Sequence, residues 1–274
     1  MRSNKVAIIY DFDKTLSPKN MQEFSMHRHM GYDDPKRMWK EAADIGAKCH
    51  MDGVLAYMLL VMMKYPGLSN EALREEGKQV KYYPGVRSWF KRINEYGKQR
   101  GLEVEHYIIS SGLAEILNGS SIAKEFKKIY GCEYAFEEGI IWPSRVVNYT
   151  AKTQYIFRIN KGVFDADNDA DLNKSTKDDE KYVPYSHMIY IGDGYTDVPC
   201  MKIVSQYGGN TIAVYGTAKD KEELAKPLFN DKRATFLAKA DYREGQEIDT
   251  IIKTIIDNIH AVTKLDRYKL GEDL

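Results

Sequence analysis

Strand-like segments that end in acidic or small polar residues recur along this chain and restrict its fold more than any other feature. Residues 6–10 (VAIIY) are continuously apolar and rich in β-branched side chains, and Asp11 follows them directly. A similar succession returns at residues 103–112 (EVEHYIISSG) and 187–194 (HMIYIGDG), and residues 210–216 (NTIAVYG) form another strand-like run. Helix-like segments separate these runs. The alternation predicts an α/β fold with a doubly wound parallel sheet, because strands covered by helices on both faces read as short apolar runs.

The same periodicities predict further elements. An amphipathic helix follows the turn at Pro84 and Gly85, and other helices are predicted at residues 121–130, from Lys152, from Asp197 and at residues 246–265. A short strand is expected at residues 132–136 and a hairpin at residues 138–147.

Residues 17–83 differ in composition and periodicity from the rest of the chain. They include a Met-rich run with helical periodicity, GVLAYMLLVMMKY, and a segment for which Ser69 or Asn70 would be the N-cap. A chain of 274 residues suits one large domain with an insertion. We therefore expect a core formed by residues 1–16 and 84–274, interrupted by a compact helical insertion at residues 17–83.

Composition excludes several classes of protein. Basic and acidic residues both number 40, so no bulk charge favours nucleic acid or an anionic membrane surface. No apolar stretch reaches the roughly 20 residues of a spanning helix, and the start of the chain does not resemble a signal peptide. The cysteines, Cys49, Cys132 and Cys200, lack the spacing of a zinc site or redox pair. These features predict a soluble protein of the reducing cytoplasm.

Four polar side chains are expected at the carboxyl ends of strands: Asp11, Asp13, Ser110 and Asp193. Ligands of doubly wound sheets bind at these ends, near the point where the strand order reverses. Residues i and i+2 of an extended chain point to the same side, so Asp11 and Asp13 can enter one cleft. Their repulsion can be relieved by Mg²⁺, which prefers oxygen ligands, or by a proton held on one carboxylate. Asp193 would supply another carboxylate to the metal.

Four segments, in this order, resemble the motifs of the haloacid dehalogenase-like (HAD) phosphohydrolases. They are DFDKT at residues 11–15, IISSG at residues 108–112, Lys152, and GDGYTD at residues 192–197. DxDxT alone is a moderate signal, but its combination with the other motifs is strong. The resemblance covers nearly the whole chain and implies a Rossmann-like HAD core, with residues 17–83 as a small α-helical cap domain. Phosphoserine phosphatase has a similar layout.

The resemblance also implies a role for each matching residue. Asp11 would be the nucleophile that takes the phosphoryl group, and Asp13 would protonate the leaving oxygen and later activate water. Ser110 and Lys152 would bind phosphoryl oxygens, with Thr15, Ser111 and Gly112 as further substrate-binding residues. The implied Mg²⁺ site consists of Asp11, Asp13 through its backbone carbonyl, Asp193, and Asp197, which would hold Asp193 or a metal-bound water. Members that break carbon–halogen bonds lack the second aspartate, so Asp13 points to phosphoryl transfer.

Structural roles could also account for these residues. Asp11 and Asp13 could form a turn, and Thr15, Ser110, Ser111 or Asp197 could cap helices. Lys161 is an alternative candidate for the phosphate-binding lysine. We prefer Lys152, because Lys152 opens a helix. Residues 162–184 are acidic and without periodicity, which predicts a loop. Its aspartates depart from a calcium-binding pattern and leave open whether it binds a second cation.

The substrate is expected to be a small phosphorylated metabolite read by residues 17–83. Candidates for contact with the leaving group are Gln22, Glu23, His27, Arg28, Arg37 and Trp39. Phosphoserine phosphatases carry a glutamate for the substrate's ammonium where Asn20 stands here, which argues against phosphoserine. The predicted function is a Mg²⁺-dependent phosphomonoesterase acting through an aspartyl phosphate. The alternatives are a phosphotransferase to an acceptor alcohol and a non-catalytic phosphate-binding module.

Overall fold

A computed structural model describes residues 3–216, 221–269 and 271 of the chain. Within these residues strands and helices alternate as an α/β protein requires. The strands are β1 (Lys5–Tyr10), β2 (Glu103–Leu113), β3 (Lys128–Glu137), β4 (Ile140–Arg145), β5 (Met188–Gly192), β6 (Asn210–Tyr215) and β7 (Phe236–Lys239). The helices are α1 (Met26–His29), α2 (Pro35–Cys49), α3 (Gly53–Lys64), α4 (Asn70–Gly77), α5 (Val86–Lys98), α6 (Ala114–Gly119), α7 (Lys152–Lys161), α8 (Asp169–Asn173), α9 (Val198–Gln206), α10 (Lys221–Asn230) and α11 (Glu247–Lys269).

The strands form one sheet in the order β4-β3-β2-β1-β5-β6-β7. All neighbours are parallel except β3 and β4, which form an antiparallel hairpin. The hairpin predicted at residues 138–147 is wrong in its bounds, because these residues supply only the turn and the second strand, and β3 is the first strand. The chain builds outward from β1 through β2 and β3, then returns to the other side of β1 with β5. The strand order therefore reverses between β1 and β5, and the predicted doubly wound α/β fold is confirmed.

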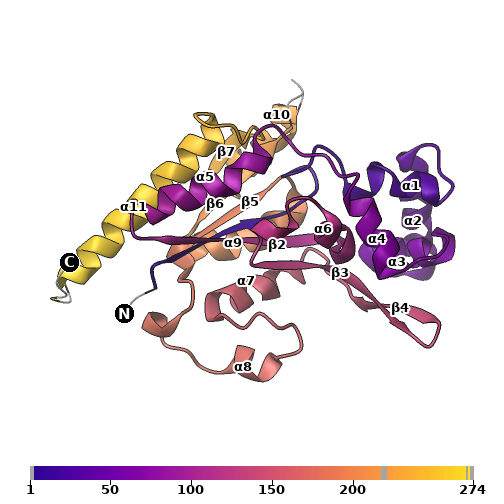
Figure 1. Cartoon of the computed structure of the whole chain (residues 1–274), viewed down its shortest axis with the longest axis horizontal. Coiled ribbons are helices and arrows are strands. Elements are labelled where there is room, and N and C mark those ends of the chain that lie inside the picture. The colour runs from indigo at the N-terminus through magenta and orange to yellow at the C-terminus, as the bar shows by residue number, and fades with distance from the viewer. Residues whose placement is uncertain (1–2, 217–220, 270, 272–274) are drawn as a thin grey trace.

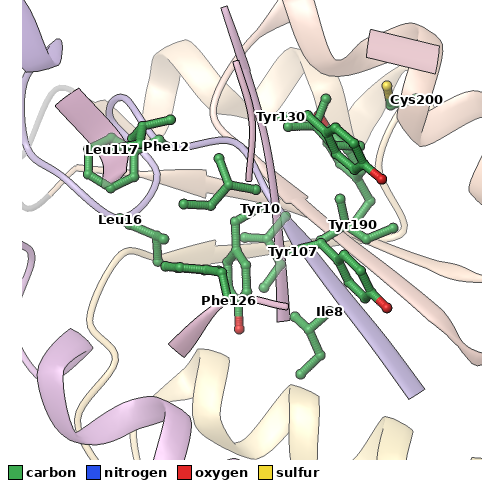
Figure 2. Close-up of a cluster of buried hydrophobic side chains, with 14 of the residues drawn as sticks. Ile8, Tyr10, Phe12, Leu16, Tyr107, Leu117, Phe126, Tyr130, Tyr190 and Cys200 are labelled. Carbon is green, nitrogen blue, oxygen red and sulfur yellow. The ribbon is translucent and has the colours of Figure 1, made fainter. Parts of the chain in front are cut away.

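Helices cover both faces of the sheet. In Figure 1, α5 and α11 lie along one face, while α7 and α9 lie on the other. Between these layers the central strands β1, β5 and β6 and most of β2 are buried. Tyrosines from four neighbouring strands pack within the core: Tyr10, Tyr107, Tyr130 and Tyr190 (Figure 2). Such a core holds the strand ends, where the predicted site residues lie, in a rigid frame.

Helices α1 to α4 form a group of their own at one end of the sheet (Figure 1). The β3–β4 hairpin reaches this group, where the Tyr134 hydroxyl donates to the carbonyl of Met58 at 2.7 Å. Helix α4 also crosses α6 at very close range, because glycines lie at the contact. A Cβ on Gly77 would lie 2.2 Å from the Ile116 carbonyl oxygen, and one on Gly119 would lie 2.1 Å from the carbonyl oxygen of Arg74. These contacts fix the helical insertion beside the carboxyl ends of β1 and β2.

Two further sequence expectations are wrong. Residues 121–130 do not form an α-helix and contain only a 3-10 turn at Ala123–Glu125. Helix α6 ends at Gly119, and β3 begins at Lys128, earlier than the predicted strand at residues 132–136. Pairing of Ile108 with Ile129 and Ile109 with Tyr130 extends the sheet here and overrides the local helical pattern.

The acidic segment at residues 162–184 is not a plain loop either. It contains α8, whose first turn is capped by the Asn168 side chain accepting from the backbone N–H of Asp171 at 3.1 Å. The buried Arg158 guanidinium organises the segment by donating to the carbonyls of Asp165 and Ala166 at 2.7 and 2.9 Å. Arg158 thus holds the beginning of the acidic segment through its backbone carbonyls.

Across the described ranges, none of the helices is long and apolar enough by itself to cross a membrane. Helices α2 and α3 meet the length and hydropathy criteria only as a pair, bent by 116°.

Candidate active site

The point where the strand order reverses brings two of the predicted aspartates together. Asp11 follows β1 and Asp193 follows β5, and the Asp11 backbone N–H donates to the carbonyl of Ile191 at 2.9 Å. The pairing of β1 with β5 therefore positions the first and last motifs side by side. Ligand sites of doubly wound sheets form at such a crevice.

A tight turn after β1 presents Asp13 to the same crevice. The Phe12 carbonyl accepts from the backbone N–H groups of Thr15, Leu16 and Ser17 at 2.9–3.2 Å, and Lys14 has a left-handed φ of 58°. The Asp13 carboxylate accepts from the Met21 N–H at 2.7 Å. This last bond ties Asp13 to the start of the helical insertion.

The serines of the second motif lie at an irregularity within β2. Regular pairing with β3 stops at Ile109 and resumes at Leu113, and the chain between them carries extra residues. Ser110 is buried and accepts from the Gly112 N–H at 3.0 Å. Helix α6 begins only at Ala114 without a side-chain cap. The bulge thus explains why these residues face the crevice, and neither serine caps the helix.

Lys152 enters the site from the first residue of α7. The Asn148 side chain accepts from the Ala151 N–H at 2.8 Å just before the helix. The Lys152 ammonium lies 2.8 Å from Asp197 Oδ1 and 3.2 Å from Asp11 Oδ1, and all three side chains are buried. Lys161, in contrast, donates to the carbonyls of Leu172 and Lys174 at the far end of α7. The structure therefore places Lys152 at the site and Lys161 in the acidic segment.

Asp197 occupies the N-cap position of α9, but its side chain caps no N–H of that helix and accepts locally only from the Gly194 N–H at 3.4 Å. Its carboxylate instead accepts from Lys152 and from the Tyr190 hydroxyl, both at 2.8 Å. A Cβ on Gly192 would lie 2.4 Å from Asp197 Oδ2, so only glycine at the end of β5 leaves room for this carboxylate. Asp197 therefore holds the Lys152 ammonium without lining the cavity itself.

Burial and mutual repulsion raise the pKa values of the carboxylates in the crevice. Burial raises the pKa of Asp11 to about 6, although Lys152 opposes the shift. Burial and then Asp11 raise the pKa of Asp13 well above its ordinary value. The same two causes raise the pKa of Asp193 to about 8. Burial alone would lower the pKa of Lys152, but Asp11 and Asp197 outweigh it and raise the pKa. The site thus combines a permanent cation with carboxylates that repel one another.

A divalent cation would relieve this repulsion, and the residues fit one. Single carboxylate oxygens of Asp11, Asp193 and Asp197 lie within 4.8 Å of one another. Asp11 and Asp193 line the cavity, whereas Asp197 does not, since Lys152 and Tyr190 already engage it. Two carboxylates facing a polar cavity match the needs of Mg²⁺, which keeps waters and substrate oxygens as its other ligands.

The crevice opens into a cavity of about 400 Å³ between the sheet and the helical insertion. On the sheet side it is lined by Asp11, Asp13, Lys14, Ser110, Ser111, Gly112, Lys152, Asp193, Gly194, Tyr195 and Thr196. On the insertion side it is lined by Asn20, Gln22, Trp39, Gly53, Val54 and Tyr57. Residues from all four motifs therefore meet around one space.

Some predicted residues lie elsewhere. Thr15 is fully buried, does not line the cavity, and its carbonyl accepts from the Tyr242 hydroxyl at 2.9 Å. It caps no helix. Of the candidates in the insertion, only Gln22 and Trp39 line the cavity. The others do not line it: Glu23, His27, Arg28 and Arg37.

Sequence reasoning missed Tyr57, because the helical periodicity of the Met-rich run equally fits a face toward the interior of the insertion. One face of α3 both packs in that interior and borders the cavity, and periodicity cannot separate these roles.

Fold and site together define a doubly wound α/β protein with a buried, acidic, lysine-containing centre at the point where the strand order reverses. A sequence profile of the haloacid dehalogenase-like hydrolases matches residues 8–202, and the chain belongs to this family. An uncharacterized protein from Borreliella burgdorferi is 28% identical over 280 aligned positions, covering 90% of this chain and 95% of its own.

Solved structures share the fold. One is a phosphoserine phosphatase described as a phospho-aspartyl intermediate analogue (TM-score 0.53, 17% identity, 91% of this chain and 98% of that one). Another is a probable phosphoserine phosphatase from Vibrio cholerae (TM-score 0.58, 12% identity, 96% of this chain and 68% of that one).

Proposed function

We propose that this hydrolase cleaves phosphate monoesters of small metabolites through an aspartyl phosphate on Asp11, with Mg²⁺ as cofactor. The observation that carries the proposal is the buried contact of Asp11 with Lys152 in the lining of a cavity that Asp13 and Asp193 also line. A nucleophilic carboxylate can approach an anionic phosphate only where positive charge offsets the repulsion. The description of a phosphoserine phosphatase of similar fold as a phospho-aspartyl intermediate analogue supports the same chemistry.

The reaction proceeds in two balanced steps. A carboxylate oxygen of Asp11 forms a bond to phosphorus while the bond between phosphorus and the ester oxygen breaks. The ester oxygen keeps the bonding electron pair and takes a proton from Asp13. Water then attacks the acyl phosphate, Asp13 accepts its proton, and Asp11 is restored as inorganic phosphate leaves. The raised pKa of Asp13 supports its role as the proton donor, because a proton must be present before the leaving group needs it.

The other residues of the crevice orient the phosphoryl group. Lys152, held by Asp197, and the Ser110 hydroxyl would bind phosphoryl oxygens, with Ser111 and Gly112 beside them. Asp11, Asp193 and the backbone carbonyl of Asp13 would hold the cation. Bound Mg²⁺ would neutralise and align the phosphoryl oxygens.

The helices of residues 17–83 would act as a cap over this centre. Their side chains border the cavity opposite the aspartates, which supports a role in reading the leaving group and excluding water from the acyl phosphate. The domain division predicted from the sequence, with a core at residues 1–16 and 84–274, is part of this proposal.

Phosphate release from a panel of monoesters, with and without Mg²⁺, tests the proposal. We expect Mg²⁺-dependent release by the wild-type protein and none by Asp11→Asn. Mass spectrometry of rapidly quenched protein should show a phosphoryl adduct on the peptide containing Asp11. Full turnover by Asp11→Asn would refute the mechanism. A phosphorylated acceptor alcohol in place of free phosphate would identify a transferase, and binding without either product would identify a binding module.

A further inference from the structure

The insertion side of the cavity carries no ionised side chain among the residues that the structure describes there. Its lining consists of Asn20, Gln22, Trp39, Gly53, Val54 and Tyr57. All charged lining residues belong to the sheet side, where the phosphoryl group would lie. The part of the cavity left for the leaving group is therefore uncharged, with amide and hydroxyl groups set among apolar surface.

Glu23 lies close to this surface and positions two of its side chains, Asn20 and Trp39. Its Oε1 accepts from Asn20 Nδ2 at 2.7 Å and from Trp39 Nε1 at 2.9 Å, and Glu23 does not line the cavity. The two hydrogen bonds take up one N–H of Asn20 and the indole N–H of Trp39. The side-chain oxygen and the second N–H of Asn20, and the ring face of Trp39, remain for a ligand.

Gln22 has an acceptor that nothing in the described chain satisfies. The side chain is 1% exposed, and its Nε2 donates to the Tyr57 hydroxyl at 2.8 Å, while its Oε1 has no hydrogen-bond partner within residues 3–216, 221–269 and 271. A buried acceptor without a partner costs about 1–3 kcal/mol. Gln22 lines the cavity, so a ligand hydroxyl that enters beside it can donate to this oxygen while Nε2 keeps its hydrogen bond to Tyr57.

Tyr57 supplies the complementary group. Its hydroxyl oxygen accepts from Gln22 and keeps its own proton for donation. An acceptor and a donor thus lie side by side, which matches a ligand hydroxyl because a hydroxyl both donates and accepts. The rings of Trp39 and Tyr57, with centroids 5.3 Å apart and planes tilted by 43°, form an apolar wall next to this pair.

We propose that the leaving group is neutral and polyhydroxylated, so that the substrates are sugar or polyol monophosphates. This inference rests on the proposed phosphatase function. Hydroxyls would satisfy Gln22 Oε1, Asn20 Oδ1 and the Tyr57 hydroxyl, and the C–H face of the carbon skeleton would pack on Trp39. The ammonium or carboxylate of a phosphorylated amino acid would lose water without meeting an opposite charge on this side of the cavity, which is costly.

A kinetic comparison with acetyl phosphate as the reference tests the inference. Acetyl phosphate has a small leaving group without hydroxyls and reports on the chemistry alone. With Mg²⁺ present, we expect at least one hexose or polyol phosphate to exceed phosphoserine and the nucleoside monophosphates in kcat/KM by about 100-fold or more. Gln22→Leu should lower the ratio of sugar phosphate to acetyl phosphate turnover by about 10-fold. The same exchange at the exposed Gln99 should leave that ratio unchanged.

Asn20→Glu provides a gain-of-function test, because it adds a carboxylate to the uncharged side. We expect it to raise kcat/KM for phosphoserine relative to the sugar phosphate. Calorimetric binding of the best sugar phosphate to Asp11→Asn, compared with Asp11→Asn/Gln22→Leu, measures recognition separately from turnover, and circular dichroism verifies that each variant is folded.

The outcomes separate the two proposals. Absence of acetyl phosphate hydrolysis with Mg²⁺ would overturn the proposed function. Hydrolysis of acetyl phosphate together with a preference for phosphoserine or a nucleoside monophosphate, or an unchanged ratio and binding constant in the Gln22 variants, would overturn the inference alone.

Discussion

The Lys152 ammonium lies 3.2 Å from Asp11 Oδ1, and the surrounding protein encloses both side chains. Asp197 holds the ammonium from its other side at 2.8 Å. One buried cation therefore serves two carboxylates, and the proposed nucleophile has its counter-charge in place before any substrate arrives. Because this charge is positioned by the fold, approach of an anionic phosphate needs no rearrangement at this point.

Replacement of Lys152 by methionine should impair both activity and folding. Loss of the ammonium leaves Asp11 and Asp197 without a counter-charge, and removal of one partner from a buried ion pair costs about 3–5 kcal/mol of the free energy of unfolding. We expect kcat/KM for phosphate release to fall by about 10²–10³-fold. Denaturant titration and phosphate release measure the two effects. Lys161→Met is the matched control, since that ammonium binds carbonyls of the acidic segment, and full activity of Lys152→Met would contradict the assignment.

The proton-donor role of Asp13 predicts that its variants depend on the leaving group. Burial and the Asp11 carboxylate raise the pKa of Asp13, so the side chain can deliver a proton to an alkoxide. Asp13→Asn should slow formation of the phosphoryl adduct from an alkyl phosphate by about 10²–10⁴-fold. An aryl phosphate with an acidic phenol should be affected much less, because its leaving group departs without a proton. Rapid-quench measurement of adduct formation tests this expectation. An equal decrease in the rate of adduct formation for both esters would show that Asp13 is not the proton donor.

Much of this site follows from local sequence, because a parallel sheet converts positions along the chain into positions in space. Asp11 and Asp193 each follow a short apolar strand, and parallel strands bring such ends to one edge of the sheet. The helix that begins at Lys152 can also be predicted from local sequence. The distance between Lys152 and Asp11 cannot, since it depends on how α7 packs against the sheet.

Elements whose structure is decided by distant partners could not be predicted. Residues 121–130 have helical periodicity, yet pairing with β2 draws their last part into β3. The acidic segment has no periodicity, yet Arg158 organises it through backbone carbonyls. On the insertion side, residue type is enough to identify Gln22 and Trp39 as candidates. Tyr57 cannot be identified in this way, because a helix face toward a cavity has the same hydrophobic pattern as a face toward a core.

Magnesium should stabilise the protein against heat if Asp11 and Asp193 bind it. A ligand that binds only the folded state raises the free energy of unfolding, by about 2.7 kcal/mol at 100 times its dissociation constant. We expect the Tm to rise with Mg²⁺ concentration in the wild type and to respond far less in Asp193→Asn. Asp167→Asn, in the exposed part of the acidic segment, is the control and should keep the full response. Loss of the Tm response in the Asp167 variant, but not in the Asp193 variant, would show that the cation binds in the acidic segment.

A buried histidine should make stability depend on pH in the acidic range. His106 on β2 lies between the Tyr10 hydroxyl at 3.0 Å and the Asn94 side-chain oxygen at 2.8 Å, a set of partners that suits the neutral ring. Burial lowers the pKa of His106 from 6.5 to about 3. The unfolded chain therefore binds the proton below pH 6.5 while the folded chain does not, so stability is complete above pH 6.5 and falls as the pH drops toward 3.

The slope of the free energy of unfolding against pH, measured by urea titration between pH 4 and 6, isolates this contribution. His106→Gln should reduce the slope by up to about 1.4 kcal/mol per pH unit, since glutamine keeps the hydrogen-bonding positions without taking up a proton. Carboxylates contribute equally to both proteins and cancel in the comparison. Identical slopes would show that His106 is protonated in the folded state.

The close crossing of α4 and α6 predicts that Gly77 tolerates no side chain. A Cβ at this position would lie 2.2 Å from the Ile116 carbonyl oxygen, and the obstacle is backbone that cannot rotate away. Gly77→Ala should therefore push α4 off α6 and lower the free energy of unfolding by about 1–3 kcal/mol or more. Gly46→Ala is the matched control: it lies within α2 and outside the cavity lining, its φ is not left-handed, and the nearest atoms to its added Cβ are at the ordinary contact distances of 3.4 and 3.6 Å. Because α4 belongs to the insertion and α6 follows β2, the displacement should also widen the cavity and raise KM more than it lowers kcat. A Gly77 variant with wild-type stability and kinetics would mean that the insertion is not held against the sheet through this crossing.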